Sequence, residues 1–468
     1  MGLTALILSR LQFAFTVSFH IVFPSFTIGL AAWLCVLEGL HLVTRHPVYR
    51  RLFDFWLKIF GIAFGLGVVS GIVMAFEFGT NWSRLSEATG PIQGPLLSYE
   101  TFTAFALEAS FFGMLIFGRP RVSPFAYFFA TLMVALGTTF SAFWIMVNNS
   151  WMQAPVGYEI VDGAYVPTDW SAIIFSPVVW VRFPHMLIAA YLTGAFCVAA
   201  TGAWYRLRNT YAAEARVMLR MGLFLAAFLV PVQLLFGHLN GDYVHDRQPA
   251  KFAAIEARWH DEQPAAEVLM ALPDPASESN RFEFKIPYLG SLIATMSLNS
   301  KEVGLTDFAP SDRPPVGIPF FAFRIMVACG LAMMAIAWLG SYALLTLRTG
   351  RERLLLWVTF LSFPLPFVAT LTGWFTAEVG RQPWTVYGLM RTADAVTPHL
   401  TVDATLTSLI FFGLLYLLIF SFGTLCIYRL LRAGPVSAPA ARPTNAKRPL
   451  AVPGASPVVG VHSEEGRV

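Results

Sequence analysis

Two of the nine histidines in this chain, His20 and His185, lie well inside long apolar runs, where a polar side chain is costly. Neutral imidazole is a common axial ligand of haem iron, although each histidine could instead hydrogen-bond to a neighbouring helix. Met326 lies about as deep in a later apolar run as His185 does in its own, and a thioether can fill the second axial position. A His185–Met326 pair could therefore hold one six-coordinate, low-spin haem b, which is an electron-transfer site.

Arginines accompany both members of this pair. Arg182 precedes His185 by about one helical turn, and Arg324 precedes Met326 by two residues. A buried guanidinium needs an anionic partner, and the propionates of a haem are suitable partners. The alternative is that both arginine side chains extend to the membrane interface, where water solvates their charges.

Three glutamates also lie in apolar runs or at their ends. Glu100 and Glu108 share one run and are two helical turns, about 12 Å, apart, whereas Glu378 ends another run. A single carboxyl in such a position can be a protonated hydrogen-bonding group between helices. Two carboxyls in one run indicate a proton relay instead.

Helices that cross a membrane must position these groups. Of 468 residues, 56% are hydrophobic and only 13% are charged, about half the charged fraction of a soluble domain. Lipid requires backbone hydrogen bonds to be internal, and nine apolar segments could cross the roughly 30 Å hydrocarbon layer as helices. The sequence therefore predicts an all-α, polytopic integral membrane protein with about nine transmembrane helices in helical bundles, near residues 12–37, 55–79, 97–118, 124–147, 177–203, 217–240, 316–347, 354–376 and 404–428.

The charged loops predict the orientation of these helices. Eleven arginines lie in the short loops of one side and three in those of the other side. The positive-inside rule then places the N-terminus outside and the C-terminus in the cytoplasm. The expected organisation is six transmembrane helices, a long outer-side loop, three further helices and a disordered cytoplasmic tail rich in Pro, Ala and Ser, at residues 1–240, 241–315, 316–430 and 431–468 respectively.

The small number of interior histidines excludes two other kinds of haem protein. A haem–copper oxidase or a bis-histidine dihaem cytochrome b needs more interior histidines than two. The four cysteines lie in apolar stretches without a CxxC pair, so we expect neither a disulfide framework nor a thiolate metal site. The net charge is a modest +4, and we expect no nucleic acid partner.

Several short motifs occur together in a recognisable order. The most specific is GWFTAEVGRQPW at 373–384, which is similar to the signature GWxxxExGRQPW of one family. The other motifs are SRLQF at 9–13 ahead of His20, SYE at 98–100 with Glu108, RFPH at 182–185, GD at 241–242 and FRIM at 323–326. Up to about residue 430, the chain resembles subunit I of the cytochrome bd quinol oxidases.

This resemblance implies three haems: a low-spin haem b, a high-spin haem b and a haem d. The family's low-spin ligands fall on His185 and Met326. Its other protein ligands fall on His20 and Glu378, and the resemblance leaves open which of them serves which of the other two haems. It also places Glu100 close to this haem pair, Glu108 on a proton path, and four residues near the haems or their propionates: Arg182, Arg324, Trp374 and Arg381.

The long loop resembles the family's quinol-binding loop, with Lys251 and Glu256 at the matching quinol-site positions. Lys251 would hold a quinol oxygen and Glu256 would accept a released proton, although residues five apart also form ordinary surface pairs. The loop lacks the C-terminal insertion of longer members, so the chain resembles the short-loop branch. That branch includes cyanide-insensitive oxidases, in which a haem b is the alternative to haem d.

The resemblance implies the haem-binding subunit of a terminal oxidase in the bacterial inner membrane, with a periplasmic N-terminus and a cytoplasmic C-terminus. It would oxidise quinol on the periplasmic side and reduce O2 to water, generating proton motive force by charge separation without pumping. The implied partners are a second large membrane subunit, subunit II, and a small single-helix subunit. Two alternatives stay open: a quinol-linked membrane cytochrome without oxygen reduction, and a secondary transporter, although the sequence shows no inverted repeat.

Overall fold

The computed structural model describes residues 4–346 and 353–435, so the predicted cytoplasmic tail from residue 436 onward lies outside the described residues. Nine helices in this part of the chain are long and apolar enough to cross a membrane, which confirms the predicted fold class. They span Ala5–Thr44, Pro47–Thr80, Ser83–Phe117, Pro124–Gln153, Trp170–Leu207, Ala212–Arg247, Gly317–Thr346, Arg353–Val379 and Val402–Ala433.

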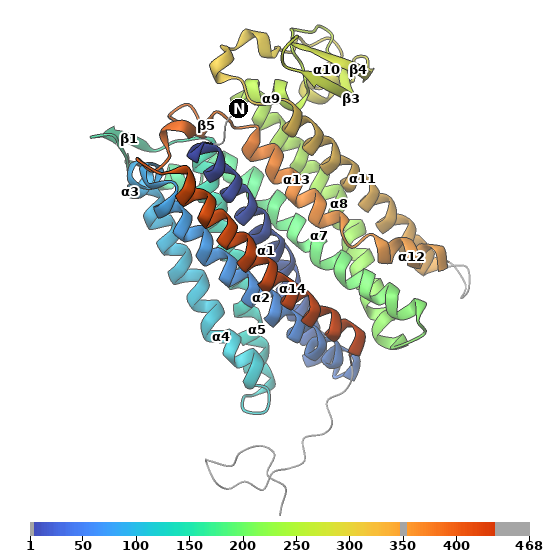
Figure 1. The fold of residues 1–468 in the computed structure, drawn as a ribbon. Helices are drawn as coiled ribbons and strands as arrows, with labels where there is room; N and C mark the ends of the chain where they lie inside the picture. Colours follow the sequence, from blue (N-terminus) through green and yellow to red (C-terminus); the bar gives the residue numbers. More distant parts are fainter. Residues whose placement is uncertain (1–3, 347–352, 436–468) are drawn as a thin grey trace, which may run out of the picture. The chain divides into compact units, whose positions relative to one another are not determined.

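Three of these spans are interrupted, and the others are single helices running side by side (Figure 1). The single helices are α1 (Ala5–Thr44), α2 (Pro47–Thr80), α5 (Pro124–Gln153), α8 (Ala212–Arg247), α11 (Gly317–Thr346) and α14 (Val402–Ala433). The interrupted spans are α3 (Ser83–Glu100) with α4 (Ala106–Phe117), α6 (Trp170–Ile174) with α7 (Pro177–Leu207), and α12 (Arg353–Leu361) with α13 (Leu365–Val379). A π-helical turn at Thr101–Phe105 separates α3 from α4.

The described strands form three antiparallel pairs at one end of the bundle, which we name the loop end because it carries residues 248–316 (Figure 1). The pairs are β1 (Tyr158–Val161) with β2 (Ala164–Pro167), β3 (Glu267–Asp274) with β4 (Ser279–Ile286), and β5 (Trp384–Val386) with β6 (Met390–Arg391). The two short helices α9 (Pro249–Ile255) and α10 (Leu289–Thr295) lie there as well, together with the start of α1. Strand edges are costly in lipid, so their confinement to one end fits a membrane bundle.

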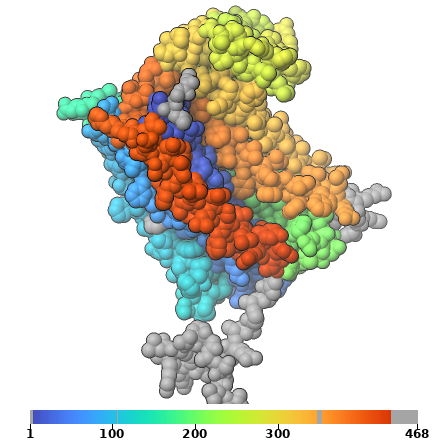
Figure 2. Space-filling model, viewed as in Figure 1, coloured from blue at the N-terminus to red at the C-terminus, as the bar shows by residue number. Residues whose placement is uncertain are grey.

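The long loop of the sequence analysis contains regular structure. Helix α8 continues to Arg247, beyond the boundary expected at residue 240. After it, α9, the β3–β4 hairpin and α10 cover the loop end of α8 and α11, and in Figure 2 they form the uppermost part of the molecule. Trp259, Val268 and Leu305 of this segment pack with Phe320 of α11 in one apolar cluster. That cluster fastens the loop segment to the bundle.

Helices α1 and α7 cross at two glycines. A Cβ atom on Gly29 would lie 2.3 Å from the carbonyl oxygen of Ala190, and one on Gly194 would lie 2.9 Å from the carbonyl carbon of Gly29. Small residues at such crossings let membrane helices approach closely. His20 and His185 precede Gly29 and Gly194 by nine residues each, about 13.5 Å of helix. Both helices begin at the loop end, so the two histidines lie on the same side of the crossing.

Helices α7, α8, α11 and α13 form a four-helix group with its own apolar core. This core contains Ile188 and Leu192 of α7, Val230 of α8 and Met333 of α11, with Ala369 of α13 packed against them. Membrane helices hold one another mainly through such van der Waals packing. The four helices are therefore held as one unit around the space between them.

At the opposite end of the bundle, a buried ion pair ties α1 to the loop that precedes α5. Arg119 donates to both carboxylate oxygens of Glu38, at 2.6 and 3.2 Å. Its guanidinium carbon lies 4.0 Å from the ring centroid of Tyr127 and 4.8 Å from that of Phe53. The Glu38 carboxylate is almost fully buried, so this pair fixes the helix ends to one another.

Candidate functional site

A cavity of about 470 Å3 lies within the four-helix group and extends to the loop end. This volume falls in the range of roughly 300–1,000 Å3 that is usual for small-molecule sites. His185, Met326 and Trp374 line the cavity, and so do Lys251 and Glu256 of the loop segment. The predicted axial pair and the two predicted quinol residues therefore border one continuous space.

Each member of the His185–Met326 pair packs against a glycine of the neighbouring helix. A Cβ atom on Gly237 of α8 would lie 3.3 Å from Cε1 of His185, and one on Gly373 of α13 would lie 3.0 Å from Sδ of Met326. His185 Nε2 lies 3.3 Å from the side-chain amide of Gln233, whereas its buried Nδ1 has no hydrogen-bond partner among the described residues. Because an unpaired buried nitrogen costs free energy, this imidazole fits a metal ligand at the cavity wall.

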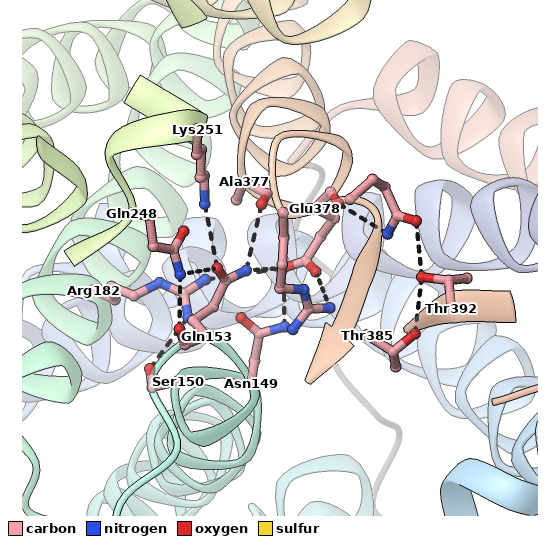
Figure 3. Close-up of polar contacts among 12 residues, drawn as sticks. Asn149, Ser150, Gln153, Arg182, Gln248, Lys251, Ala377, Glu378, Thr385 and Thr392 are labelled. Atoms are coloured by element: carbon pink, nitrogen blue, oxygen red, sulfur yellow. Dashed lines mark hydrogen bonds and ion pairs between the residues drawn. The ribbon is translucent and has the colours of Figure 1, made fainter. Parts of the chain in front are cut away.

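Two arginines share the Glu378 carboxylate beside the cavity. Arg381 Nη2 donates to Glu378 Oε2 at 2.5 Å, and Arg182 Nη2 lies 4.0 Å from Glu378 Oε1. The Nε and Nη1 atoms of Arg381 are buried without hydrogen-bond partners in the described part of the chain. Lys251, which is only 5% exposed, adds a third cation to this cluster (Figure 3). A surplus of buried positive charge fits an anionic group such as a haem propionate.

Gln153, at the C-terminal end of α5, joins Lys251 to Glu378 (Figure 3). Its Nε2 donates to Glu378 Oε1 at 3.2 Å, and its Oε1 accepts from Lys251 Nζ at 3.2 Å. Gln248 Nε2 also donates to Gln153 Oε1, at 3.2 Å. Burial and the neighbouring Arg182 lower the pKa of Lys251 to about 7, so its charge changes near neutral pH.

Arg324 binds groups of the loop segment. Its Nη2 donates to Glu256 Oε2 at 2.8 Å and lies 3.1 Å from Glu267 Oε1. Its Nε and Nη2 also donate to the carbonyl oxygen of Val268, at 3.0 and 2.6 Å. Arg324 thus fastens the end of α9 and the start of β3 to α11, and its expected role at a haem propionate stays a prediction.

His20 lies between α1 and α2 and does not line the cavity of the His185–Met326 pair. Its Nδ1 is 3.0 Å from Ser70 Oγ, whose hydroxyl donates to the carbonyl oxygen of Gly67 at 2.9 Å. Nδ1 therefore carries the imidazole proton, and Nε2 keeps a lone pair for a metal. A Cβ atom on Gly71 would lie 3.2 Å from Cε1 of His20, so this helix contact also depends on a glycine.

The two glutamates of the third span lie on either side of its π-helical turn. Ser141 of α5 donates to Glu100 Oε1 at 2.8 Å. Glu108 is buried against α5, where a Cβ atom on Gly137 would lie 2.8 Å from its Cγ. A π turn changes the direction of the residues that follow it, relative to the regular helix expected from the sequence. Both carboxyl side chains consequently contact α5.

Three buried polar residues of this region were not among the predicted site residues. Gln153 lies just beyond an apolar run, and Glu267 lies within the long loop. A search for polar groups inside apolar runs could therefore find neither of them. Glu77 lies inside the apolar run 55–79 and satisfies that criterion. It is 0% exposed, and both its carboxylate oxygens lack hydrogen-bond partners among the described residues.

Fold and site together define a multi-pass helical membrane protein with a cavity between its helices. The model of the family "Cytochrome bd terminal oxidase subunit I" matches residues 8–435. The "Cytochrome bd ubiquinol oxidase subunit 1" of Bacillus subtilis (strain 168) is 35% identical over 444 residues, which cover 92% of this chain and 93% of that protein. The "Cytochrome bd-II ubiquinol oxidase subunit 1" of Escherichia coli (strain K12) is 32% identical over 509 residues, covering 94% and 98%.

A solved structure shares the fold. The bd oxidase from Geobacillus thermodenitrificans superposes with a TM-score of 0.86 at 26% identity, over 92% of this chain and 99% of that chain. The chain belongs to the cytochrome bd terminal oxidase subunit I family. The predicted family and the predicted oxidoreductase class are thereby confirmed. Membership also implies haem cofactors and a second subunit of the oxidase.

Proposed function

We propose that this chain is the haem-carrying subunit of a terminal quinol oxidase, which oxidises quinol at the loop end and takes part in the reduction of O2 to water. The observation that carries this proposal is the single cavity that joins Lys251 and Glu256 to His185 and Met326. A quinol bound beside the first two residues would lie next to the redox site of the other two. A donor site and an acceptor site that share one cavity favour electron transfer over substrate transport.

We assign the low-spin haem b to His185 and Met326. The unpartnered His185 nitrogen, the two glycine contacts and the excess of buried positive charge support this assignment. Arg182, Arg381 and Trp374 belong to its surroundings. The bound haems would supply electron transfer and oxygen reduction.

The remaining two haems, a high-spin haem b and either haem d or a further haem b, are assigned to His20 and Glu378. The Ser70 hydrogen bond supports His20 as a ligand, because a partner on Nδ1 orients the ring and leaves Nε2 for iron. Glu378 receives hydrogen bonds from Arg381, Asn149 and Gln153, which fix the position of its carboxylate.

At the quinol site, Lys251 donates a hydrogen bond to a quinol oxygen, and Glu256 accepts a proton released on oxidation. Gln153 holds the Lys251 ammonium, while Arg324 holds the Glu256 carboxylate in place. The Lys251 and Glu256 side chains are therefore held in place before quinol binds, which lowers the entropy cost of binding. We leave ubiquinol and menaquinol as the two candidate substrates.

The proposed setting is the bacterial inner membrane, with the loop end and N-terminus periplasmic and the C-terminus cytoplasmic. Quinol protons leave at the loop end, whereas protons for O2 reduction arrive from the cytoplasm past Glu108 and Glu100. Charge then separates across the membrane without a pump. Subunit II and a small single-helix subunit are the proposed protein partners.

Two substitutions test the ligand assignment. His185→Ala and Met326→Ala should each remove the low-spin haem signal from the reduced-minus-oxidised spectrum and abolish quinol oxidation. The matched controls, His399→Ala in an exposed loop and Met334→Ala in the apolar core of the four-helix group, should keep both. A low-spin signal that survives in both ligand variants would refute the assignment. A colourless wild-type complex that consumes no oxygen would refute the proposed function itself.

A further inference from the structure

The loop-end part of the cavity contains a second carboxyl group that the proposed quinol site does not use. Glu267, the first residue of β3, lines the same cavity as Glu256 and is 9% exposed. Arg324 Nη2 lies between the two carboxylates, 2.8 Å from Glu256 Oε2 and 3.1 Å from Glu267 Oε1. One guanidinium nitrogen therefore bridges the two acidic side chains.

A buried arginine with one nitrogen that makes no hydrogen bond also faces this part of the cavity. Arg258 lines it, is 5% exposed, and its Nη1 has no hydrogen-bond partner among the described residues. A donor that is buried without a partner next to an open space fits a site for an oxygen-bearing ligand. This independent observation indicates that the Glu256–Glu267 end of the cavity is a binding site as well as a structural contact.

The charges around Glu267 come from few groups. Glu256 and Arg258 face it from the turn after α9, and Arg324 faces it from α11. On the paired strand β4, Lys285 interacts with Glu262 and Glu283 instead. Burial and the neighbouring Glu256 carboxylate raise the pKa of Glu267, so Glu267 retains a proton more readily than an exposed glutamate.

We propose that Glu267 is a second proton-accepting residue of the quinol-oxidation site, which passes the protons that Glu256 receives on to solvent at the loop end. The inference rests on the proposed function and deepens it. Oxidation breaks both O–H bonds of the quinol and gives a quinone, two protons and two electrons. The electrons leave through the oxidase reaction to O2, and the protons leave one after the other through Glu256 and Glu267. A single carboxylate would have to empty before it could take the second proton.

The test is Glu267→Gln in the complete oxidase complex. We expect kcat for quinol oxidation to fall about tenfold with little change in KM, because proton transfer slows while quinol contacts persist. The acidic limb of the kcat/KM profile should also lose the part that belongs to Glu267, because a glutamine does not titrate. Infrared difference spectra should lose a protonated-carboxyl band that the wild type shows on quinone reduction.

Two controls separate the possible outcomes. Glu283→Gln lies on the same hairpin and should match the wild type in rate and pH profile. An artificial one-electron donor, tetramethyl-p-phenylenediamine, together with the haem spectrum, shows whether the Glu267→Gln complex is intact. An intact variant with wild-type kcat, pH profile and infrared spectrum would overturn the role of Glu267. Absence of quinol oxidation in the wild type would instead count against the proposed function.

Discussion

The contact between Gly373 and Met326 gives a quantitative test of the low-spin site. In Gly373→Ala, the new methyl carbon would lie 3.0 Å from Met326 Sδ, whereas nonbonded carbon contacts are optimal at about 3.5–4.0 Å. The thioether must therefore give way by a few tenths of an ångström. Metal–ligand distances tolerate about 0.2 Å, so the required shift is too large for an intact iron–sulfur bond.

The expected result is a partial or complete change of the low-spin haem to a high-spin form, with a lower midpoint potential because methionine ligation raises it. Reduced-minus-oxidised spectra and a redox titration of the purified complex measure both effects. Alanine is favoured over glycine by about 1 kcal/mol inside a helix, so a general loss of stability is not expected. Gly413→Ala on α14 is the matched control, because no atom lies within 4 Å of its added Cβ. An unchanged spectrum and midpoint in Gly373→Ala would refute the proposal that Met326 Sδ is an iron ligand.

Two further predictions concern charge. Burial and Arg182 lower the pKa of Lys251 to about 7, so this side chain is mostly charged at pH 6 and mostly neutral at pH 8. The KM for quinol should therefore rise from pH 6 to pH 8 in the wild type. In Lys251→Arg, which keeps its charge, the KM should stay constant over the same interval. A wild-type KM that is constant from pH 6 to 8 would contradict this. Glu38→Gln leaves the Arg119 guanidinium without its buried partner and should lower the free energy of unfolding by about 3–5 kcal/mol in chemical denaturation. As a control, Arg281→Ala removes an exposed ion pair and should lower the free energy of unfolding by at most about 1 kcal/mol. Equal losses of unfolding free energy in the two variants would contradict the stabilising effect expected from burial of the Glu38–Arg119 pair.

Much of the fold could be predicted from the sequence because the membrane restricts what an apolar run can do. A run of 20 or more apolar residues has to be a helix in lipid, and its length and depth follow from the thickness of the hydrocarbon layer. The depths of His185 and Met326 in the membrane were likewise predicted from their positions within their apolar runs. Helix ends were harder to predict, since α8 extends up to Arg247 through polar residues, beyond the end of the apolar run.

Some residues of the candidate site could be predicted from the sequence, and others could not. His20, His185 and Glu108 stand out as polar side chains in apolar surroundings. Gln153 and Glu267 do not, because a polar residue next to a membrane boundary is ordinary until its neighbours are known. Their importance comes from distant residues, since Gln153 contacts Glu378 and Glu267 contacts Arg324.

The sequence by itself determined the class of protein, the helices and the chemical types of the candidate ligands, because these depend on composition and on local periodicity. Only the tertiary structure decided which side chains meet. The π turn before Glu108, the glycine crossing of α1 and α7, and the bridge from Arg324 to two carboxylates all depend on how helices rotate and pack against one another. Such packing joins residues far apart in the chain, and no local pattern records it.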